Sequence, residues 1–449
     1  MSFSQALSGL NAQQEKLGAV GNNIANSQTV GFKSSNVQFA DVYAQSSIGL
    51  GVRTSAVLQN FNSGNIESSS RNMDLAIAGE GFFRFQQPNG EIGYSRNGQL
   101  TMTANGDLVN AQGAQIMGYP ADAQGNIQGG GDVEALSVDA GDLAASATTE
   151  LDVSLNLDAE EEVLVDADDN PTFTVYSSPG VIDEAATAAN VANGLDSSQY
   201  SYSTNGTIYD SQGNARNLTM YFTKTAANEW QVDARMSGGP AGAPNYGFTN
   251  IAEGENFDFT TDGRLNDNFT AFDIDLDTPD AIRDGDGNTV ANSEFGGATP
   301  TLTSQQIQVD FPNTTQFANS STVNDLAQNG YTSGSLVGVT IEDDGSIMRN
   351  YSNEESRAAG QVALVSFRNP EGLSPNGDNL WTATGSSGQE LVGAPGTGQR
   401  GLIEPGAVET SNVDMAAELV DMIVAQRAYQ ANSQTISTQD ELLQTIINL

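Results

Sequence analysis

The sequence predicts an α+β protein, in which paired terminal α-helices form a coiled-coil-like core domain and two nested, mostly-β domains lie outside it. Three observations support this prediction. Apolar residues recur at helical spacing in residues 1–26 and again in residues 411–449. Between these ends, short apolar runs alternate with Gly, Asn and Asp, which is typical of strands joined by tight turns. The low aromatic content, 7%, and the 48 glycines favour several small β-domains over one large globule.

The first element is a helix over residues 1–26. Apolar residues recur there every seven positions, with one more at the half-step, which is the stripe of a helix that packs against another helix. The stripe consists of Phe3, Leu7, Leu10, Leu17 and Ile24. The opposite face is polar. The chain leaves the helix through the turn-forming segment 26–33, and the predicted core domain includes residues 1–33 at this end.

The last element is a helix over residues 411–449, which completes the predicted core domain. No Pro or Gly interrupts it, so at about 1.5 Å per residue it is on the order of 55 Å long. Its apolar stripe recurs every seven residues, with further members in the intervening register: Met415, Leu419, Met422, Tyr429, Ile436, Leu443 and Ile447. Polar residues share the intervening register, so the coiled-coil seam is imperfect. Ser411 and Asp414 have the spacing of a capping box at the start of the helix.

Two helices with long apolar stripes need partners in water. We therefore predict that the stripe residues of both helices form a polymerisation interface between copies of the chain. An ordinary two-helix hairpin inside a monomer would show the same periodicity. The middle of the chain, however, offers no further helix that could complete such a bundle.

Between the helices the sequence predicts β-structure. Residues 34–70 are polar with scattered apolar positions, and we expect an extended, partly irregular connector there. Residues 71–149 and 331–410 are predicted to form an inner β-domain, in which Asp74–Phe85 has the pattern of a hairpin. Residues 150–330 are predicted to form an inserted outer β-domain.

Within the outer domain, the clearest hairpin is Thr207–Tyr221, and Trp230–Met236 is expected to add a third strand. The second tryptophan, Trp381, lies in a separate predicted strand, so both tryptophans are expected to pack in cores. The Gly-rich stretch 385–400 and the 34–70 connector are candidate hinges.

The formal net charge of −40 comes from 56 acidic and 16 basic residues. Such a field disfavours nucleic acid and anionic membranes as partners. It also makes copies of the chain repel one another, so any assembly is expected to depend on ionic strength. Plain solubility or a salty habitat would account for the charge equally well.

The chain contains no Cys and no His, which excludes disulfides, thiolate or imidazole metal sites, and Ser-His-Asp catalysis. Carboxylate pairs of the kind that hydrolyse glycosides remain open, but no pair stands out among 56 acidic residues. We expect no enzymatic activity and no cofactor.

Residues Asp284–Asn288 resemble the start of a calcium loop, but Thr289 replaces the required Gly and Glu294 lies one position early. We therefore expect no metal.

The chain begins without a basic segment followed by an apolar one, so we expect no cleaved signal peptide. It also has no run approaching about 18 apolar residues, so we expect no membrane insertion.

Both ends of the chain carry longer motifs. The segment SGLNAQQEKLGAVGNNIANSQTVGFK at 8–33 resembles the opening motif of the axial proteins of the bacterial flagellum, and residues 411–449 resemble their closing motif. The motif residues in place at the N-terminal end include Asn22, Asn23, Ile24, Ala25, Asn26, Thr29, Gly31, Phe32 and Lys33. Rod, hook and junction proteins share these ends. YDSQGNARNLTMYFTK at 209–224 and DLAIAGEGFF at 74–83, together with residues 351–373, are similar to segments of the hook proteins in particular.

The resemblance implies a structural subunit that polymerises into a curved, flexible tube. In that family the terminal helices form the inner tube and the β-domains form outer shells. The tube acts as a universal joint that transmits torque from the motor to the filament and provides an export channel. The implied partners are further copies of the chain, the rod and hook-filament junction proteins, the hook cap protein and the flagellar type III export apparatus. The implied location is extracellular, in the hook, after export without a cleaved signal.

Two other functions stay open at this stage. A distal rod or hook-filament junction subunit would have the same terminal motifs, and straight polymers would favour it. A secreted acidic β-rich adhesin belongs to a different class, and glycan binding without polymerisation would favour it.

Overall fold

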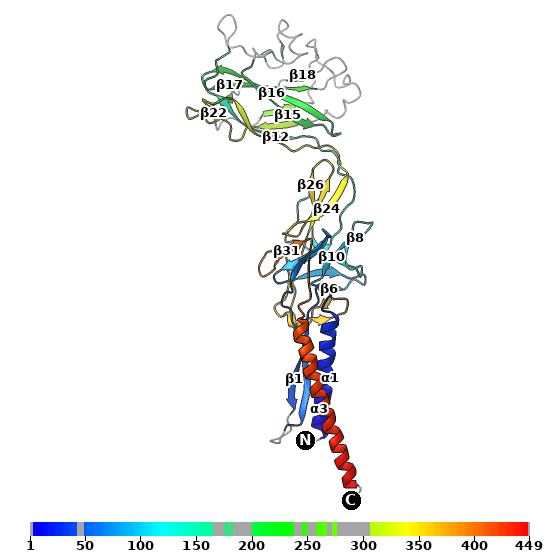
Figure 1. The fold of residues 1–449 in the computed structure, drawn as a ribbon. Coiled ribbons are helices and arrows are strands. Elements are labelled where there is room, and N and C mark those ends of the chain that lie inside the picture. Colours follow the sequence, from blue (N-terminus) through cyan, green and yellow to red (C-terminus); the bar gives the residue numbers. More distant parts are fainter. Residues whose placement is uncertain are drawn as a thin grey trace. The chain divides into compact units, whose positions relative to one another are not determined.

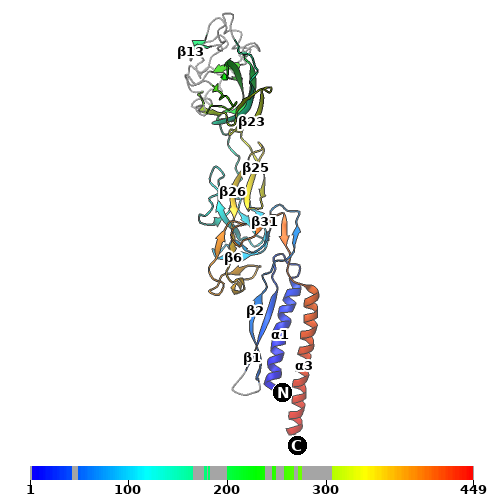
Figure 2. The same ribbon diagram turned by 90° about the vertical axis from the view of Figure 1, so that its left-hand side faces the viewer.

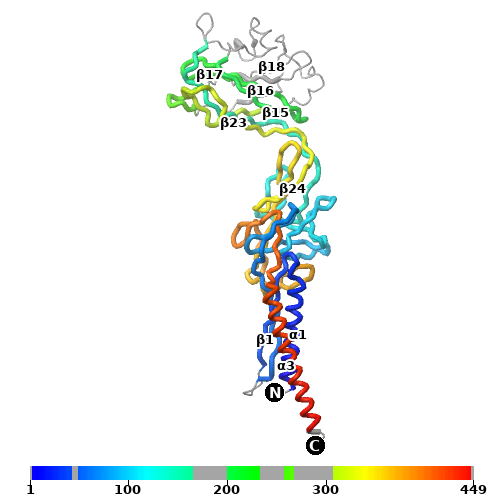
Figure 3. The backbone as a smooth tube through the Cα atoms, viewed as in Figure 1, coloured from blue at the N-terminus to red at the C-terminus, as the bar shows by residue number. Residues whose placement is uncertain are grey.

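The computed structural model describes residues 3–42, 49–164, 176–178, 181–182, 200–237, 245–248, 257–266, 272–275 and 306–447. These residues are mostly β-structure, with an α-helix near each end of the chain (Figure 1). The chain divides into two compact units, and the tube in Figure 3 follows their segments by colour. The first unit comprises Met1–Gly141, Leu336–Asn350 and Ser356–Leu449, and the second comprises Asp142–Ser335 and Tyr351–Glu355.

The first unit begins with helix α1 (Phe3–Ala25) and ends with helix α3 (Met415–Ile447). α1 stops where the sequence turns to NSQT, because these side chains bond to the backbone in place of the next helical turn. The Asn26 amide donates to the backbone oxygen of Asn22, and the Ser27 hydroxyl donates to that of Ile24. At the start of α3, the Asp414 carboxylate accepts the backbone N–H groups of Ala416 and Ala417.

This cap differs from the predicted capping box, which had Ser411 as the N-cap residue and Asp414 inside the helix. The helix begins three residues later than that, and Asp414 itself is the N-cap. An Asp side chain reaches the free N–H groups of the first turn, and its charge suits the positive end of the helix. Ser411 instead accepts the N–H of Val413.

Residues 34–70 are more regular than the connector that the sequence predicts. Strands β1 (Ser35–Val42) and β2 (Gly51–Gln59) pair in antiparallel fashion with a bulge after Gln38. Figure 2 shows this hairpin, α1 and α3 side by side, and both strands contact α1. The Ser8 hydroxyl of α1 accepts the N–H of Val52 at 3.2 Å. A helix beside the segment supplies the apolar cover that the sparse apolar residues of these strands cannot supply themselves. These contacts give the segment a packed structure, not that of a free hinge.

The β-part of the first unit is built around one connected sheet with smaller sheets beside it. Its N-terminal strands are β3 (Ile66–Ser68), β4 (Asp74–Ala78), β5 (Phe82–Gln86), β6 (Ile92–Ser95), β7 (Gly98–Gln99), β8 (Thr101–Met102), β9 (Leu108–Val109), β10 (Gln115–Pro120) and β11 (Glu134–Ala135). Its C-terminal elements are β24 (Leu336–Ile341), β25 (Ser346–Tyr351), β26 (Ser356–Val362), β27 (Leu364–Ser366), the 3₁₀ turn η3 (Pro370–Gly372), β28 (Ser374–Pro375), β29 (Trp381–Thr382), β30 (Leu391–Gly393), β31 (Leu402–Pro405) and β32 (Ala407–Glu409).

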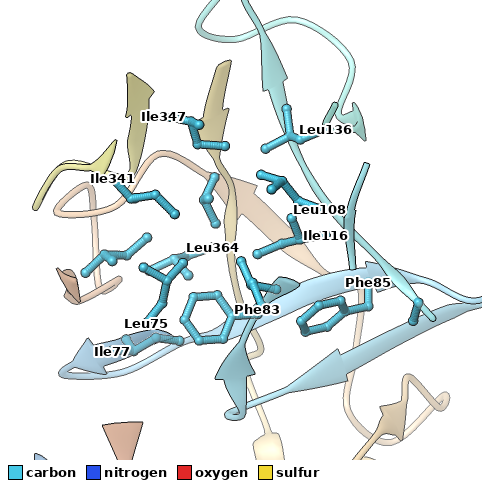
Figure 4. Close-up of a cluster of buried hydrophobic side chains, with 14 of the residues drawn as sticks. Leu75, Ile77, Phe83, Phe85, Leu108, Ile116, Leu136, Ile341, Ile347 and Leu364 are labelled. Atoms are coloured by element: carbon cyan, nitrogen blue, oxygen red, sulfur yellow. The ribbon is translucent and has the colours of Figure 1, made fainter. Parts of the chain in front are cut away.

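Strands from both halves of the sequence share one core. Figure 4 shows Phe83 and Phe85 of β5 packed among aliphatic side chains that include Leu364 and Ile347 from the C-terminal half. In the main sheet, β24-β25-β26 of the C-terminal half lie beside β10-β5-β6 of the N-terminal half, and β29-β28 of the C-terminal half follow. Neither half can bury its apolar strands alone, so the two halves fold as one unit.

The predicted hairpin at Asp74–Phe85 is wrong, although both of its strands exist. β4 pairs with β31 and β7, whereas β5 pairs with β6, β10 and β27. Four of the five residues of β4 are buried, so this strand needs cover on both faces, which an isolated hairpin cannot give.

The stretch 385–400 is anchored and not a loose linker, because β30 pairs with β27. The Arg400 guanidinium also donates to the backbone oxygens of Leu391 and Ala394. This differs from the predicted hinge at these residues.

Among its described residues, the second unit contains two five-stranded sheets and the two-stranded sheet β13–β14. Its strands are β12 (Glu150–Asp158), β13 (Tyr176–Ser178), β14 (Val181–Ile182), β15 (Tyr202–Tyr209), β16 (Ala215–Ala226), β17 (Glu229–Ser237), β18 (Asn245–Phe248), β19 (Phe257–Asp258), β20 (Phe272–Asp275), β21 (Gln306–Asp310), β22 (Thr315–Phe317) and β23 (Thr322–Gln328). The predicted hairpin at Thr207–Tyr221 is confirmed as β15–β16, and β17 adds the predicted third strand.

Alternate residues of β12, from Leu151 to Leu157, point into the core of the second unit, and Trp230 is buried against them. Trp381 is buried in the first unit against Phe61 and Phe82. Both tryptophans thus pack in cores, as predicted.

The candidate calcium loop at Asp284–Asn288 lies outside the described residues. Among the helices of the described chain, none is apolar and long enough to span a membrane.

Candidate assembly surface

The two terminal helices pack against each other in antiparallel fashion. The Asn23 side-chain amide donates to the Glu418 carboxylate at 2.9 Å near one end of the pair. At the other end, a Cβ added to Gly9 would lie 2.9 Å from the side-chain amide nitrogen of Asn432. Lys16 and Asp421 form an ion pair at 3.0 Å between these points. Small residues in the seam, such as Gly9 and the fully buried Ala425, allow the two helices to approach closely.

The structure divides the predicted stripes into two groups. Leu10, Leu17 and Ile24 of α1, and Met422, Tyr429 and Ile436 of α3, are half-buried. On α3, positions spaced by three and four residues from Glu418 to Gln439 are less exposed than their neighbours, which is the pattern of a helix seam. This half of the predicted interface therefore lies at the α1–α3 seam of one chain.

The other group faces outward. Its members are Phe3, Leu7, Met415, Leu419 and Leu443. Ile447 is the last residue of α3, and its side chain lies outside the described residues. Phe3, Leu7, Met415, Leu419 and Leu443 are 43% to 54% exposed within the described part of the chain. They remain candidates for contact with another copy.

Sequence reasoning found Leu419 but missed the other three residues in the most prominent part of this surface. Leu419, Val420, Ile423 and Val424, which we call the α3 stripe, are 47%, 61%, 51% and 54% exposed. Residues at these spacings lie on one side of a helix. Further along, Leu442 is also exposed. The signal was present in the segment ELVDMIVAQ, where apolar residues occupy two helix faces at once. The seven-residue repeat selected only one of them.

The last turns of α3 extend beyond α1. Because Asn23 lies beside Glu418 and Gly9 lies beside Asn432, the antiparallel register places Phe3 beside Thr438. The remaining turns carry Leu442 and Leu443, and Figure 1 shows them passing the start of α1. α3 therefore presents two exposed apolar segments, the α3 stripe near its start and this overhang near its end.

The N-terminal motif, Asn22–Lys33, spans the end of α1 and the turn that follows it, and we call this segment the root of α1. Asn23 is buried and exchanges two hydrogen bonds with the backbone of Ser35 at 2.9 Å. The Thr29 hydroxyl donates to Asn26. Gly31 has φ +71°, and an added Cβ would lie 2.6 Å from the backbone nitrogen of Asn97, so only glycine fits there without strain. Phe32 is buried, and Asn22 accepts the amide of Asn26.

Lys33 ends the motif in a buried charge cluster. Its ammonium donates to Oε1 of Glu409 at 2.7 Å and to the backbone oxygen of Asn62 at 2.8 Å. Arg96 donates to Oε2 of the same carboxylate at 3.2 Å. All three charged side chains are almost completely buried. Burial lowers the pKa of Lys33 against the opposing effect of Glu409, and burial likewise lowers the pKa of Arg96.

Four segments of the chain, including both terminal motifs, match known protein families. Residues 4–33 match the family "Flagella basal body rod protein", and residues 404–449 match "Flagellar basal body rod FlgEFG protein C-terminal". Residues 76–149 match "Flagellar hook protein FlgE/F/G D1 domain", and residues 180–331 match "Flagellar basal body protein FlaE D2 domain".

Similarity to individual proteins extends over the whole length. The chain is 41% identical over 452 residues to the flagellar hook protein FlgE of Escherichia coli, and the match covers 100% of both chains. It is 40% identical to the flagellar hook protein FlgE of Salmonella typhimurium, again over 100% of both. It is 31% identical to that of Borreliella burgdorferi, over 100% of this chain and 99% of the relative. The chain belongs to the family of bacterial flagellar hook proteins.

Proposed function

We propose that this structural subunit of the hook polymerises head to tail through the exposed apolar segments of α3. The observation that carries the proposal is the α3 stripe. Each apolar side chain of this size contributes on the order of 1.5–3 kcal/mol when a partner removes it from water. An open tube requires two different complementary surfaces on each subunit, because a surface that pairs with itself gives closed dimers. The α3 stripe and the overhang with Leu442 and Leu443 are separate exposed apolar segments, which supports their assignment to these two roles.

The distribution of charge supports the same proposal. Residues 1–70 hold three acidic and three basic residues, and residues 411–449 hold five acidic residues and one basic residue. Almost all of the net charge of −40 therefore lies between them, in residues 71–410. The terminal helices can approach copies of themselves with little repulsion, while the β-structure is expected to make the polymer sensitive to ionic strength.

The finer functions follow as part of the proposal. The terminal helices, with residues 1–33 and 411–449, would line an inner tube that serves as an export channel. The inner β-domain (71–149 and 331–410) and the inserted domain (150–330) would form outer layers that slide past one another as the tube bends. Weak exposed polar contacts between such layers change little in energy during sliding. A curved tube of this kind transmits torque as a universal joint.

The proposed partners are further copies of the chain, the rod and hook-filament junction proteins, the hook cap protein and the type III export apparatus. The proposed location is outside the cell, reached without a cleaved signal. We propose no enzymatic activity.

The test is electron microscopy of the purified chain at low and high salt, together with sedimentation. The double variant Val420→Ser/Ile423→Ser removes apolar area from the α3 stripe, and Gln426→Ser is the matched control, which shortens an exposed polar side chain on the same helix. Wild type and control should form curved tubes, and the double variant should stay monomeric with unchanged helical circular dichroism. Normal tubes from the double variant would rule out the α3 stripe as the main interface. Straight tubes from wild type would favour a rod subunit.

A further inference from the structure

The buried charge cluster at the root of the helices contains two cations and one carboxylate. Lys33 follows α1, and Glu409 lies in β32, six residues before α3 begins. Arg96 comes from the β-part of the same unit and is also held by the backbone oxygens of Gly79 at 2.8 Å and Ile77 at 3.5 Å. The Glu409 carboxylate, which lies shortly before α3, thus connects Lys33 at the end of α1 to Arg96 of the β-part.

The three members are not equally anchored. If Lys33 leaves, Glu409 keeps Arg96 and the backbone N–H of Gly64, which donates to Oε1 at 2.7 Å. Apart from Glu409, Lys33 has one hydrogen bond to this part of the unit, to the oxygen of Asn62. A neutral Arg96–Glu409 pair would therefore remain, with no uncompensated charge in the interior. Removal of Arg96 first would break its hydrogen bonds to the backbone oxygens of Gly79 and Ile77, and the Gly79 oxygen would keep only the 3.5 Å hydrogen bond from the Ser63 hydroxyl.

The electrostatic environment favours the departure of Lys33. Two buried cations face one buried carboxylate, and burying an excess charge is costly. The exposed carboxylate of Glu80 offsets part of this charge at Arg96, whereas the charges that act on Lys33 are Glu409 and Arg96. Burial lowers the pKa of Lys33 despite the adjacent carboxylate, so the site favours the ammonium over the neutral amine less than water does. Once released, the ammonium regains its hydration.

We propose that Lys33 is a releasable latch: the root of α1 undocks from the β-part by withdrawing Lys33, while Arg96 remains and neutralises Glu409. A device of this kind permits the N-terminal segment to open and reclose as a local event, without unfolding of the sheet. The inference concerns the single chain and does not depend on polymerisation.

Amide hydrogen exchange on the full-length monomer tests the latch. The backbone N–H of Gly31 donates to the oxygen of Glu409 at 2.7 Å, so a peptide covering 27–33 reports undocking. A peptide covering 74–86 in the buried strands β4 and β5 reports global opening of the unit. In wild type, the first peptide should exchange much faster than the second.

The decisive variant is Arg96→Met. Withdrawal of Lys33 would then leave the buried Glu409 carboxylate without a cation. Exchange of 27–33 relative to 74–86 should therefore slow by about tenfold or more, which is about 1.4 kcal/mol in the free energy of local opening. Arg84→Met is the matched control, because Arg84 pairs with Glu390 elsewhere in the same unit. The control should leave the ratio unchanged. An unchanged or faster ratio in Arg96→Met would overturn the latch.

A second variant covers the case in which Arg96→Met does not fold. Lys33→Met keeps the neutral Arg96–Glu409 pair and has no ammonium to hydrate. It should fold, leave exchange of 74–86 as in wild type, and slow exchange of 27–33. Faster exchange of 74–86 would mean that Lys33 is a fixed structural partner, and the proposal would fail.

Discussion

The ammonium of Lys33 lies 2.7 Å from the carboxylate of Glu409, a residue 376 positions away in the chain, and both side chains are completely buried. A buried ion pair is weak evidence for stability, because its desolvation offsets its attraction. Here the carboxylate also pairs with Arg96. Loss of Lys33 therefore leaves a neutral Arg96–Glu409 pair, whereas loss of Glu409 leaves buried positive charge. Glu409 is the only member whose removal strands two cations.

Substitution of the two partners should therefore have unequal effects. Glu409→Gln should lower the free energy of unfolding of the first unit by about 3–5 kcal/mol, as expected when a buried charge loses its counter-ion. Lys33→Met should change it little, because a neutral pair remains. Trp381 lies in the first unit, so its fluorescence during urea unfolding in a Trp230→Phe background measures this unit separately. Equal losses in both variants would contradict the expectation.

High pH should destabilise the first unit through Tyr94. Its hydroxyl donates to Glu390 at 2.7 Å, and Arg84 binds the same carboxylate through two nitrogens. Burial, followed by the hydrogen bond to Glu390, raises the pKa of Tyr94. In the unfolded chain a tyrosine ionises near pH ~10, while Tyr94 in the folded chain stays protonated. Above that pH the unfolded state binds fewer protons, so stability falls as pH rises.

The measurement is the urea midpoint of Trp381 fluorescence at pH values below and above 10. Wild type should show a steeper decline above pH 10 than Tyr94→Phe, which has no proton to lose at this position. Tyr94→Phe also lacks the hydrogen bond to Glu390, so only the slopes are compared. Parallel declines would show that Tyr94 does not contribute to the pH dependence.

Two glycines at the N-terminal end should respond in opposite directions to alanine. Gly31→Ala places a Cβ against the backbone of Asn97 at a positive φ, so it should destabilise the root of α1. Gly18 lies in the exposed middle of α1 with no atom within 4 Å of an added Cβ. Gly18→Ala should stabilise the helix by about 1 kcal/mol. Thermal melting followed by circular dichroism at helical wavelengths distinguishes them, and loss of stability in Gly18→Ala would contradict this assignment.

Two leucines of the predicted interface should have separate effects. Leu443→Ala removes an exposed side chain from the α3 overhang, so it should weaken polymerisation and leave the monomer unchanged. Leu10→Ala removes a half-buried side chain on α1, so it should lower monomer helicity as well. Sedimentation measures the first effect and circular dichroism the second. Normal polymerisation of both variants would show that the helices are not the main assembly element.

The sequence predicted elements best where the signal is local. The seven-residue repeats located both helices, because helical periodicity depends only on neighbouring residues. The hairpin β15–β16 was found in the same way, from two alternating strands around one turn. The strands β4 and β5 were also found, but their pairing was not, because their partners β31 and β27 lie about 280 to 330 residues later in the chain. The packing of β1 and β2 against α1 was missed for a different reason: these elements are close in the chain, but the scattered apolar residues of 34–70 give no clear strand periodicity.

The assembly surface shows the same limit. Periodicity identified apolar positions on α3 but could not tell which face the chain itself would cover. Met422 and Tyr429 lie in the seam with α1, whereas Val420 and Ile423 on another face are exposed and were not predicted. Both faces are apolar, and only the position of α1 distinguishes them.

The sequence by itself determined the class of the protein, its terminal helices, its β-rich middle and its family resemblance, because these depend on composition, spacing and motif. Tertiary structure alone decided which apolar face stays exposed, and that Lys33, Arg96 and Glu409 meet in one buried cluster. The physical reason is that burial and ion pairing are set by segments distant in the chain. A charge on Lys33 has no predictable partner until the sheet brings Glu409 within 2.7 Å of it.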